Sequence, residues 1–314
     1  MLDLLLAVLL DWMLGDPPSW PHPVKWMGTL IAKEEALVRR VARSRRAMFF
    51  GGAMIVLCNL LFAFGLPFVV LHVLKKPFPV AYHALNIYLL YACLAARCLR
   101  DEAMKVAQAF EQGIEAARHR LAFIVGRDTA QLDESEIVRA TVETVAENTS
   151  DGVIAPLFYA MIGVAPLAVA YKMVNTMDSM LGYLNAKYRD IGYVPAKMDD
   201  VWNFVPARLT SVLMLLGSLF RFDVKNGWRV MRRDRRNHKS PNCGYPESAV
   251  AGLLGVRLGG ENVYFGERVW KPTIGDATRP LERADIARAV EIMFRAEIVG
   301  MALYLIIACI LRRY

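Results

Sequence analysis

Residues 47–71 read AMFFGGAMIVLCNLLFAFGLPFVVL and contain neither a charged side chain nor a histidine. A helix needs roughly 20 apolar residues to cross the hydrocarbon layer of a bilayer, so this stretch predicts a transmembrane helix. The run continues to Leu74, and only Lys75, Lys76 and Pro77 precede a second apolar run that reaches residue 96. Two runs with so short a connection predict a transmembrane hairpin whose two ends lie in the cytoplasm.

Further apolar segments repeat this pattern along the chain. They are found at about 1–14, 47–74, 79–96, 152–171, 201–220 and 298–311. With 55% hydrophobic and 22% charged residues, the 314-residue chain is too apolar for an average soluble domain. We expect an all-α fold, a polytopic membrane helical bundle that forms one integral membrane domain. The polar regions 97–151 and 221–296 are expected in the cytoplasm, the first of them as helices over Arg97–Arg120 and Ser135–Asn148.

The run 152–171 differs from the others because Gly152, Pro156, Gly163 and Pro166 interrupt it. Proline inside a helix removes a backbone hydrogen bond and clashes with the preceding turn. Irregular backbone is tolerated at membrane depth where protein or water surrounds it. We therefore expect a broken or re-entrant helix beside a polar cavity, with a full crossing as the open alternative.

Charge and cysteine content exclude several classes of protein. The net charge is +8, but the basic residues flank apolar segments, as they do on the cytoplasmic side of membrane proteins, and no nucleic-acid-reading motif accompanies them. The five cysteines show no paired spacing, which argues against a disulfide framework or a zinc site. Asp3 stands where a signal peptide would carry a positive charge, so we expect the first apolar segment to be retained.

Four polar clusters could carry chemistry, and the first precedes the broken run. Glu143, Glu147 and Asp151 are spaced by four, which puts them on one helix face with Arg139. Mg²⁺ takes one or two carboxylates and keeps waters for substrate phosphates, so this face is a candidate metal site. A solvated helix face followed by an Asp151 N-cap is the alternative.

The second and third clusters lie on either side of residues 180–198. Lys172, Asn175 and Asp178 share a helix face at an apolar boundary, where polar groups are costly unless paired, and this favours a functional role. Asp199 and Asp200 precede Arg208, a lone cation in an apolar stretch that is expected to pair with one of these acids or with an anionic substrate.

The fourth cluster and the N-terminal segment are candidate substrate-binding regions. The fourth, between residues 232 and 271, combines arginines with flexible glycines, and a loop with positive-inside charge is its alternative. Near the start, prolines hold DWMLGDPPSWPHPVKWMG extended, as a wall of a ligand pocket or as an interfacial tryptophan segment. The candidate residues are Arg233, His238, Asn242 and Glu247 in the fourth cluster, and Asp16, His22 and Lys25 in the N-terminal segment.

Several long blocks, in this order, resemble the CbiB/CobD family of cobalamin biosynthesis proteins. They are DWMLGDPPSWPHPVKWMG, IVGRDTAQLDESEIVRATVETVAENTSDGVIAPLFYA, AYKMVNTMDSMLGYLNAKYRDIG, MDDVWNFVPARLT, RDRRNHKSPNCGYPESAVAGLLGVRLGG and NVYFGE. The resemblance implies a multi-pass enzyme of the cell inner membrane, a ligase that uses ATP. It would join (R)-1-aminopropan-2-ol phosphate, or free aminopropanol, to the propionate carboxyl of adenosylcobyric acid, giving adenosylcobinamide phosphate.

This reaction gives the clusters hypothetical roles at the cytoplasmic face. A carboxylate does not accept an amine at neutral pH without activation, so ATP should first convert it to an acyl phosphate, with Mg²⁺ and cations holding the phosphoryl group. The metal is assigned to Glu143, Glu147 and Asp151, with Asp178 as a further ligand. The phosphates are assigned to Lys172, Arg208, Arg127 and Arg233. The base that deprotonates the incoming ammonium is assigned to Asp199 or Asp200, with His238 as the alternative.

The corrinoid would be a substrate, since no DxHxxG cobalt-ligating motif occurs, and we expect no bound cobalamin cofactor. Trp12, Trp20 and Trp26 could form one wall of its site. Expected partners are adenosylcobyric acid, aminopropanol phosphate, ATP and the lipid bilayer, without nucleic acid. A homo-oligomer or association with other corrinoid-pathway membrane proteins is left open. A membrane transporter and a non-catalytic assembly or sensor protein are the alternative functions.

Overall fold

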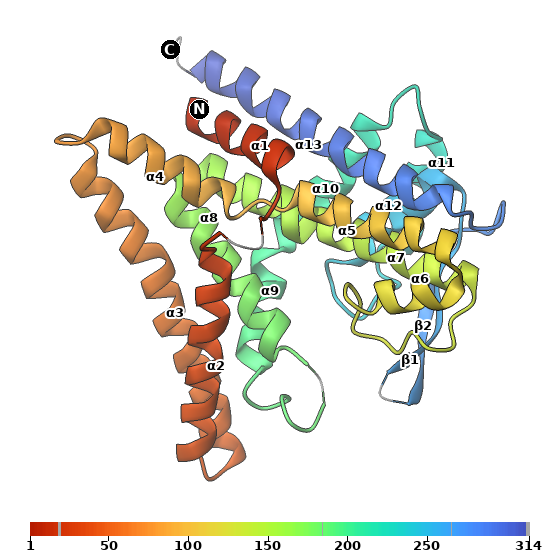
Figure 1. The fold of residues 1–314 in the computed structure, drawn as a ribbon, viewed down its shortest axis with the longest axis horizontal. Helices are drawn as coiled ribbons and strands as arrows, with labels where there is room; N and C mark the ends of the chain where they lie inside the picture. The colour runs from red at the N-terminus through yellow and green to blue at the C-terminus, as the bar shows by residue number, and fades with distance from the viewer. Residues whose placement is uncertain (18–19, 184, 265, 312–314) are drawn as a thin grey trace. The chain divides into compact units, whose positions relative to one another are not determined.

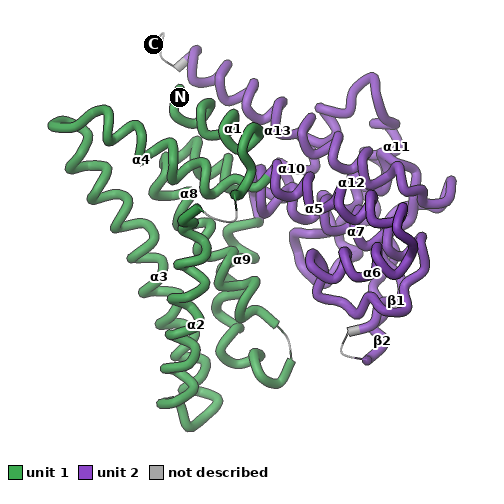
Figure 2. The backbone as a smooth tube through the Cα atoms, in the orientation of Figure 1, with its two compact units in different colours: residues 1–95, 155–203 green, residues 96–154, 204–314 purple. Residues whose placement is uncertain are grey.

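The computed structural model describes residues 1–17, 20–183, 185–264 and 266–311. Helices dominate, and the described residues add one two-stranded sheet, which confirms the predicted all-α fold. The chain forms two compact units, coloured separately in Figure 2. Unit 1 comprises residues 1–95 and 155–203, and unit 2 comprises residues 96–154 and 204–314. The prediction of a single membrane domain stays a prediction.

Unit 1 is helical throughout its regular structure. Its elements are α1 (Leu2–Leu14), α2 (Pro23–Val41), α3 (Arg45–Leu74), α4 (Pro79–Tyr91), α8 (Ala155–Leu181) and α9 (Tyr193–Trp202). A tight turn joins α3 to α4, as expected of the predicted hairpin (Figure 1). Pro23 and His22 start α2, because proline suits the first helical position and the His22 ring accepts the N–H of Val24.

Unit 2 combines helices with a β-hairpin. Its elements are α5 (Ala96–Ala109), a 3-10 turn (Phe110–Gln112), α6 (Ile114–Leu121), α7 (Glu134–Asn148), a π-helical turn (Thr149–Ile154), α10 (Phe204–Gly217), α11 (Val224–Asp234), α12 (Gly244–Leu254), β1 (Leu258–Tyr264), β2 (Glu267–Ile274) and α13 (Ala284–Leu311). Asp133 and Glu136 form a capping box at the start of α7. The expected helix over Ser135–Asn148 is therefore confirmed, whereas the one over Arg97–Arg120 is divided into α5 and α6 by the 3-10 turn and Gly113, whose φ of 106° does not fit a helix.

Four helical stretches of the described chain are long and apolar enough to cross a membrane, namely Arg45–Leu74, Pro79–Gln112, Glu134–Leu181 and Ala284–Ile310. Only a third of the most apolar part of α3 is buried. Phe50 and Leu61 on this helix are 65% and 66% exposed. Apolar surface of this extent is expected to face lipid. These helices indicate a multi-pass membrane protein.

The apolar run 201–220 forms a shorter helix than its composition predicts. A break at Asn203 ends α9, and α10 then spans 14 residues, too few for a membrane crossing at 1.5 Å per residue. Asn203 is 1% exposed, and its side chain bonds Asp199 and Tyr171. These polar contacts fix the chain direction at a point where the hydropathy pattern shows no interruption.

The predicted break in the run 152–171 is present. A π-helical turn precedes α8, and inside α8 the backbone leaves helical geometry at Gly163 (φ −128°) and Val164 (φ 56°, ψ −151°), just before Pro166. A β-branched residue at positive φ costs on the order of 1–3 kcal/mol. Whether the broken helix is re-entrant or crosses fully stays open.

The β-hairpin has no counterpart in the sequence-based prediction. β1 and β2 pair antiparallel, with Gly260 opposite Lys271 and a register shift between Leu258 and Gly260. Gly259 has φ 77°, and a Cβ there would lie 2.3 Å from the Pro272 carbonyl oxygen, so only glycine fits. The hairpin thereby presents the Gly259 backbone N–H to α7.

Candidate functional site

Four acids in unit 2 form what we call the carboxylate cluster: Glu143, Glu147, Asp151 and Glu247. Helix α7 carries the first two, the π-helical turn the third and α12 the fourth. Glu147 contacts the thiol of Cys243, and the charges of Asp151 and Glu247 also act on this thiol and raise its pKa. The three acids that the sequence grouped are thus joined by a fourth from a distant segment.

Glu143 is held by protein groups on both of its oxygens. Its Oε2 lies 2.5 Å from Nη2 of Arg127, and its Oε1 accepts the N–H of Gly259 at 2.8 Å. The pair is almost fully buried, and Arg127 also donates to Asn262. Arg139 donates to the carbonyls of Gly259 and Glu261. Glu143 therefore ties the β-hairpin to α7, and its oxygens are engaged by this role.

Two buried groups of this cluster, the Cys243 thiol and the Glu247 carboxyl, have raised pKa values. The Cys243 thiol donates to Oε1 of Glu147 at 3.0 Å, and burial raises the pKa of this thiol well above its usual value. Burial, reinforced by the charges of Glu143 and Glu147, raises the pKa of Glu247 well above that of a free glutamate. This cluster therefore carries less negative charge than its composition suggests, and a protonated thiol is a poor nucleophile.

His238 faces the same cluster. Its Nδ1 accepts the N–H of Ser240 at 3.0 Å, and its Nε2 lies 3.7 Å from Oε1 of Glu247. Burial lowers the pKa of His238, so the ring is neutral and carries its proton on Nε2. The Nε2–H group faces Glu247 across a distance too long for a direct hydrogen bond, and a second proton would go to Nδ1 only against the cost of burial.

Arg208 of α10 has a different partner set from the predicted one. Within the part of the chain that the structure describes, it contacts uncharged groups: its Nη1 donates to Oδ1 of Asn242 at 3.3 Å, and its guanidinium lies over the rings of Phe204 and Tyr245. Stacking on two aromatic faces orients the cation without neutralising it. Arg208 therefore keeps a charge that suits an anionic ligand.

Arg233, predicted to hold a phosphate, is engaged elsewhere. It binds both oxygens of Asp234 at 2.7 Å and lies 2.9 Å from Asp276. Two acids compensate its charge, so the structure shows a stabilising role for Arg233.

Unit 1 contains a pocket of about 390 Å³ that gathers four of the predicted residues. Asp16 and His22 lie 3.3 Å apart on the extended N-terminal segment, Lys25 follows on α2, and Lys172 reaches the pocket from α8. Ala92, Leu94 and Ala95 complete the lining with Pro17 and Val24. Two lysines and one carboxylate around a small cavity are suited to a small ligand that carries both signs of charge.

A second polar group in unit 1 centres on Asp199. Its carboxylate accepts the side-chain amide of Asn203 at 2.9 Å and that of Asn175 at 3.5 Å, and Tyr171 donates to Asn203 at 2.9 Å. Asp200 faces Lys197 instead, at 2.7 Å. The two adjacent aspartates therefore have different environments, since the amides of Asn203 and Asn175 donate to Asp199 and the ammonium of Lys197 donates to Asp200.

Asp178 lies one turn beyond Asn175 on α8, and its role as a further metal ligand stays a prediction. Trp20 and Trp26 are 47% and 61% exposed, and neither they nor Trp12 line the unit 1 pocket. Their assignment to a corrinoid wall stays a prediction.

Some residues of these groups were missed by sequence reasoning. Lys271 on β2 acts electrostatically on His238 and Glu247, and no local pattern distinguishes it from other lysines. Tyr171 is fully buried inside an apolar run that offers no signal. Asn203 lies in the third cluster of the sequence, between Asp200 and Arg208, but no sequence pattern assigned it a role.

The described residues contain no group of three His, Cys, Asp or Glu side chains close enough to hold a metal ion. Mg²⁺ bound through one or two carboxylates, waters and a substrate phosphate does not need such a group. Glu147 and Asp151 supply oxygen donors of that kind beside the same thiol. These donors fit magnesium. Glu143, which the sequence also assigned to the metal, is less suited as a ligand because its two oxygens are bound by Arg127 and Gly259.

The chain is similar to known proteins over nearly its whole length. A family model described as "CobD/Cbib protein" matches residues 4–293. The chain is similar to proteins named "Cobalamin biosynthesis protein CobD" from Clostridium acetobutylicum (48% identical, 100% of both chains covered), Clostridium tetani (48%, 97% of this chain and 96% of the relative) and Klebsiella pneumoniae (48%, 96% and 95%). No solved structure matches the chain.

Proposed function

This chain belongs to the CobD/Cbib protein family and acts in cobalamin biosynthesis, and from that premise we propose that it is an ATP-dependent amide ligase. The acceptor is the propionate carboxyl of adenosylcobyric acid, and the amine is (R)-1-aminopropan-2-ol phosphate or free aminopropanol. The observation that carries the proposal is the pocket of unit 1, where Lys25 and Lys172 share a small cavity with Asp16.

The amino alcohol phosphate has one anionic and one cationic end, and this pocket has partners for both. Lys25 and Lys172 bind the phosphate through charge-assisted hydrogen bonds, and Asp16, whose Oδ1 lies 3.3 Å from Nε2 of His22, attracts the ammonium. A cavity of about 390 Å³ suits a molecule of this size and is too small for a corrinoid. The pocket therefore positions the amine component.

The activation step is assigned to unit 2. The corrinoid carboxylate attacks the γ-phosphoryl group of ATP, giving an acyl phosphate and ADP, and attack by the neutral amine then forms the amide and releases phosphate. Magnesium held by Glu147 and Asp151 would supply charge shielding at the phosphoryl group. Arg208, whose charge is oriented but uncompensated, binds a phosphate oxygen.

Proton removal is assigned to Asp199. Only the neutral amine is nucleophilic, so a carboxylate must take a proton from the ammonium. The amides of Asn203 and Asn175 orient Asp199, whereas Asp200 is engaged by Lys197. We further place the protein in the cell inner membrane with these groups on the cytoplasmic side, where ATP is available and where basic flanks are expected.

The test is formation of the amide by purified protein. Full-length protein with adenosylcobyric acid, aminopropanol phosphate and MgATP should yield adenosylcobinamide phosphate and ADP in equal amounts, followed by mass spectrometry. Glu147→Gln and Asp151→Asn should each reduce turnover by at least about 10²-fold, as for loss of a group that stabilises phosphoryl transfer. Glu111→Gln, an exposed acid of the same charge, is the matched control and should retain full turnover.

Two results would contradict the proposal. Wild-type activity in both cluster variants would remove the metal and phosphate assignment. Corrinoid uptake by proteoliposomes without any amide product would support a transporter in place of a ligase.

A further inference from the structure

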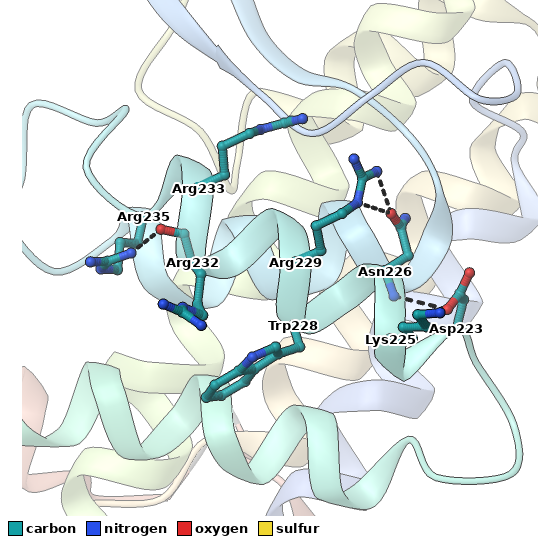
Figure 3. A pocket seen from close by; sticks show the side chains of 8 residues that line it. All are labelled: Asp223, Lys225, Asn226, Trp228, Arg229, Arg232, Arg233 and Arg235. Atoms are coloured by element: carbon teal, nitrogen blue, oxygen red, sulfur yellow. Dashed lines mark hydrogen bonds between the residues drawn. The ribbon is translucent and has the colours of Figure 1, made fainter.

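Helix α11 presents a basic face that the proposed reaction does not use. Gly227, Val230 and Met231 are buried, whereas Trp228 and Arg232 on the opposite face are exposed. The buried face packs closely, because a Cβ on Gly227 would lie only 2.7 Å from a methyl group of Leu215. This packing fixes which face of α11 is exposed. Figure 3 shows Trp228 and Arg232 next to one another, with Arg233 extending to the other side.

The face carries positive charge that the described residues leave uncompensated. Residues 221–239 include eight Lys or Arg and two Asp. Asp234 is bound by Arg233, and Asp276 is shared by Arg229 and Arg233. A pocket of about 810 Å³ on this face is lined in part by Lys225, Arg232 and Arg235. None of these three side chains takes part in the ion pairs of the described residues in this region. Asp223 is the single acid of its lining.

Contacts inside unit 2 place the start of α11 beside the point on α13 where charged residues give way to apolar ones. Arg221 lies 3.0 Å from Glu291 of α13, and Arg295 donates to the Gly217 carbonyl at the end of α10. Beyond Glu297, residues 298–310 contain no charged side chain, and this half of α13 belongs to a candidate membrane span. The turn between α10 and α11 therefore lies at the level where that span begins.

Phe220 in this turn is a second, independent sign of contact with lipid. Its side chain is fully exposed and its φ is 65°, a left-handed conformation that bulky residues rarely adopt. Leu219 and Trp228 are also exposed, at 45% and 48%. Aromatic side chains at the level of the headgroups are typical of membrane interfaces. A ligand that fits this surface needs an acyl chain to contact Phe220 and a phosphate group to contact the cations.

We propose that the basic face of α11 binds anionic phospholipid headgroups, with Lys225, Arg232 and Arg235 on the phosphates, Trp228 at headgroup level and Phe220 in the acyl region. Cations near an anionic bilayer surface each strengthen binding. Soluble phosphate would use the same cations but would gain nothing from Phe220. The site is separate from the ligation chemistry and does not depend on it.

The experiment measures lipid binding to the full-length protein in neutral detergent by native mass spectrometry, with phosphatidylglycerol and phosphatidylcholine as probes. The triple variant Lys225→Gln, Arg232→Gln, Arg235→Gln should lose about tenfold in apparent affinity for phosphatidylglycerol and little for phosphatidylcholine. Phe220→Asn, which tolerates positive φ, should weaken both lipids alike. The matched control Arg100→Gln, Lys105→Gln, Arg268→Gln removes equal charge elsewhere and should bind as wild type.

Pyrophosphate and ATP serve as soluble competitors. Unchanged phosphatidylglycerol binding by the triple variant overturns the proposal. So does binding of pyrophosphate or ATP that depends on the three cations while phosphatidylglycerol shows no preference, since the face would then be a soluble-phosphate site. If the triple variant does not fold, judged by gel filtration, Arg232→Gln alone must still lower phosphatidylglycerol affinity about twofold or more. Amide formation is measured separately, so a failure of the ligase proposal leaves this test intact.

Discussion

The buried pair of Arg127 and Glu143 offers the sharpest test of how the site is built. Replacing Arg127 with Met removes the cation and keeps most of the side-chain volume. Glu143 is 4% exposed in the unaltered protein, and in the variant the Gly259 N–H, at 2.8 Å, is its nearest remaining donor. Arg139, 3.9 Å away, is too distant for a direct hydrogen bond. The variant therefore leaves a buried carboxylate with about half of its compensation.

The magnitude follows from this loss. Breaking a buried pair by removing one partner costs about 3–5 kcal/mol, and the retained Gly259 bond places Arg127→Met near the lower end, at about 3 kcal/mol. Glu143→Leu should cost a similar amount, because it leaves the cation buried. The double variant removes both charges and should cost only about 1–2 kcal/mol, mainly for the unpaired Gly259 N–H. The pair is thus expected to be strongly non-additive.

The assay combines equilibrium unfolding of the full-length protein in detergent with hydrogen exchange of residues 258–274. Both single variants should lower stability and speed exchange in the β-hairpin, which Glu143 and Arg139 attach to α7. Arg268→Met, on an exposed pair with Glu261, is the control and should change little. A loss below about 1 kcal/mol for Arg127→Met, or additive single and double variants, would refute the account of a desolvated pair.

Three further predictions concern single groups. Lys172→Met should raise KM for aminopropanol phosphate about tenfold or more, the value of a charge-assisted hydrogen bond, while KM for unphosphorylated aminopropanol stays unchanged; equal effects on both would contradict a phosphate contact. Burial alone would raise the pKa of Asp234, but Arg233 and the Gly275 N–H outweigh it and lower that pKa; its stabilising effect is therefore present above the ordinary value near 3.8 and fades as the pH falls through the lowered pKa. Asp234→Asn should accordingly lower the unfolding free energy more at pH 7 than near pH 3, a difference that unfolding curves at both pH values would show. Cys243→Ser should retain amide formation within about threefold, since its raised pKa keeps the thiol neutral; complete loss would indicate a covalent role.

Much of the architecture was predictable because it depends on local composition. The uncharged run 47–71 became part of the 30-residue helix α3, and region 97–151 is helical at both predicted places, with an unpredicted break at residues 110–113. Gly163 and Pro166 correctly placed the break in α8. Helical and membrane signals of this kind are written in consecutive residues, since length and hydropathy decide whether a segment can leave water.

The partners of the polar side chains were far less predictable. Spacing of four put Glu143 and Glu147 on one face, but it could not show that one binds Arg127 and the other Cys243. Arg208 was expected to meet an acid or a phosphate, and the structure gives it Asn242 and two aromatic rings. The break at Asn203 likewise depends on Asp199 and Tyr171 together.

By itself, then, the sequence determined a helical membrane protein, its main apolar segments, the broken run before Lys172 and the polar residues available for chemistry. Tertiary structure alone decided which of them are neutralised, which stay charged and which meet, as Glu247 meets the acids of α7 from about 100 residues away. The physical reason is that hydropathy and helix periodicity act between neighbours in the chain, whereas desolvation and ion pairing depend on whatever the fold brings within a few ångströms.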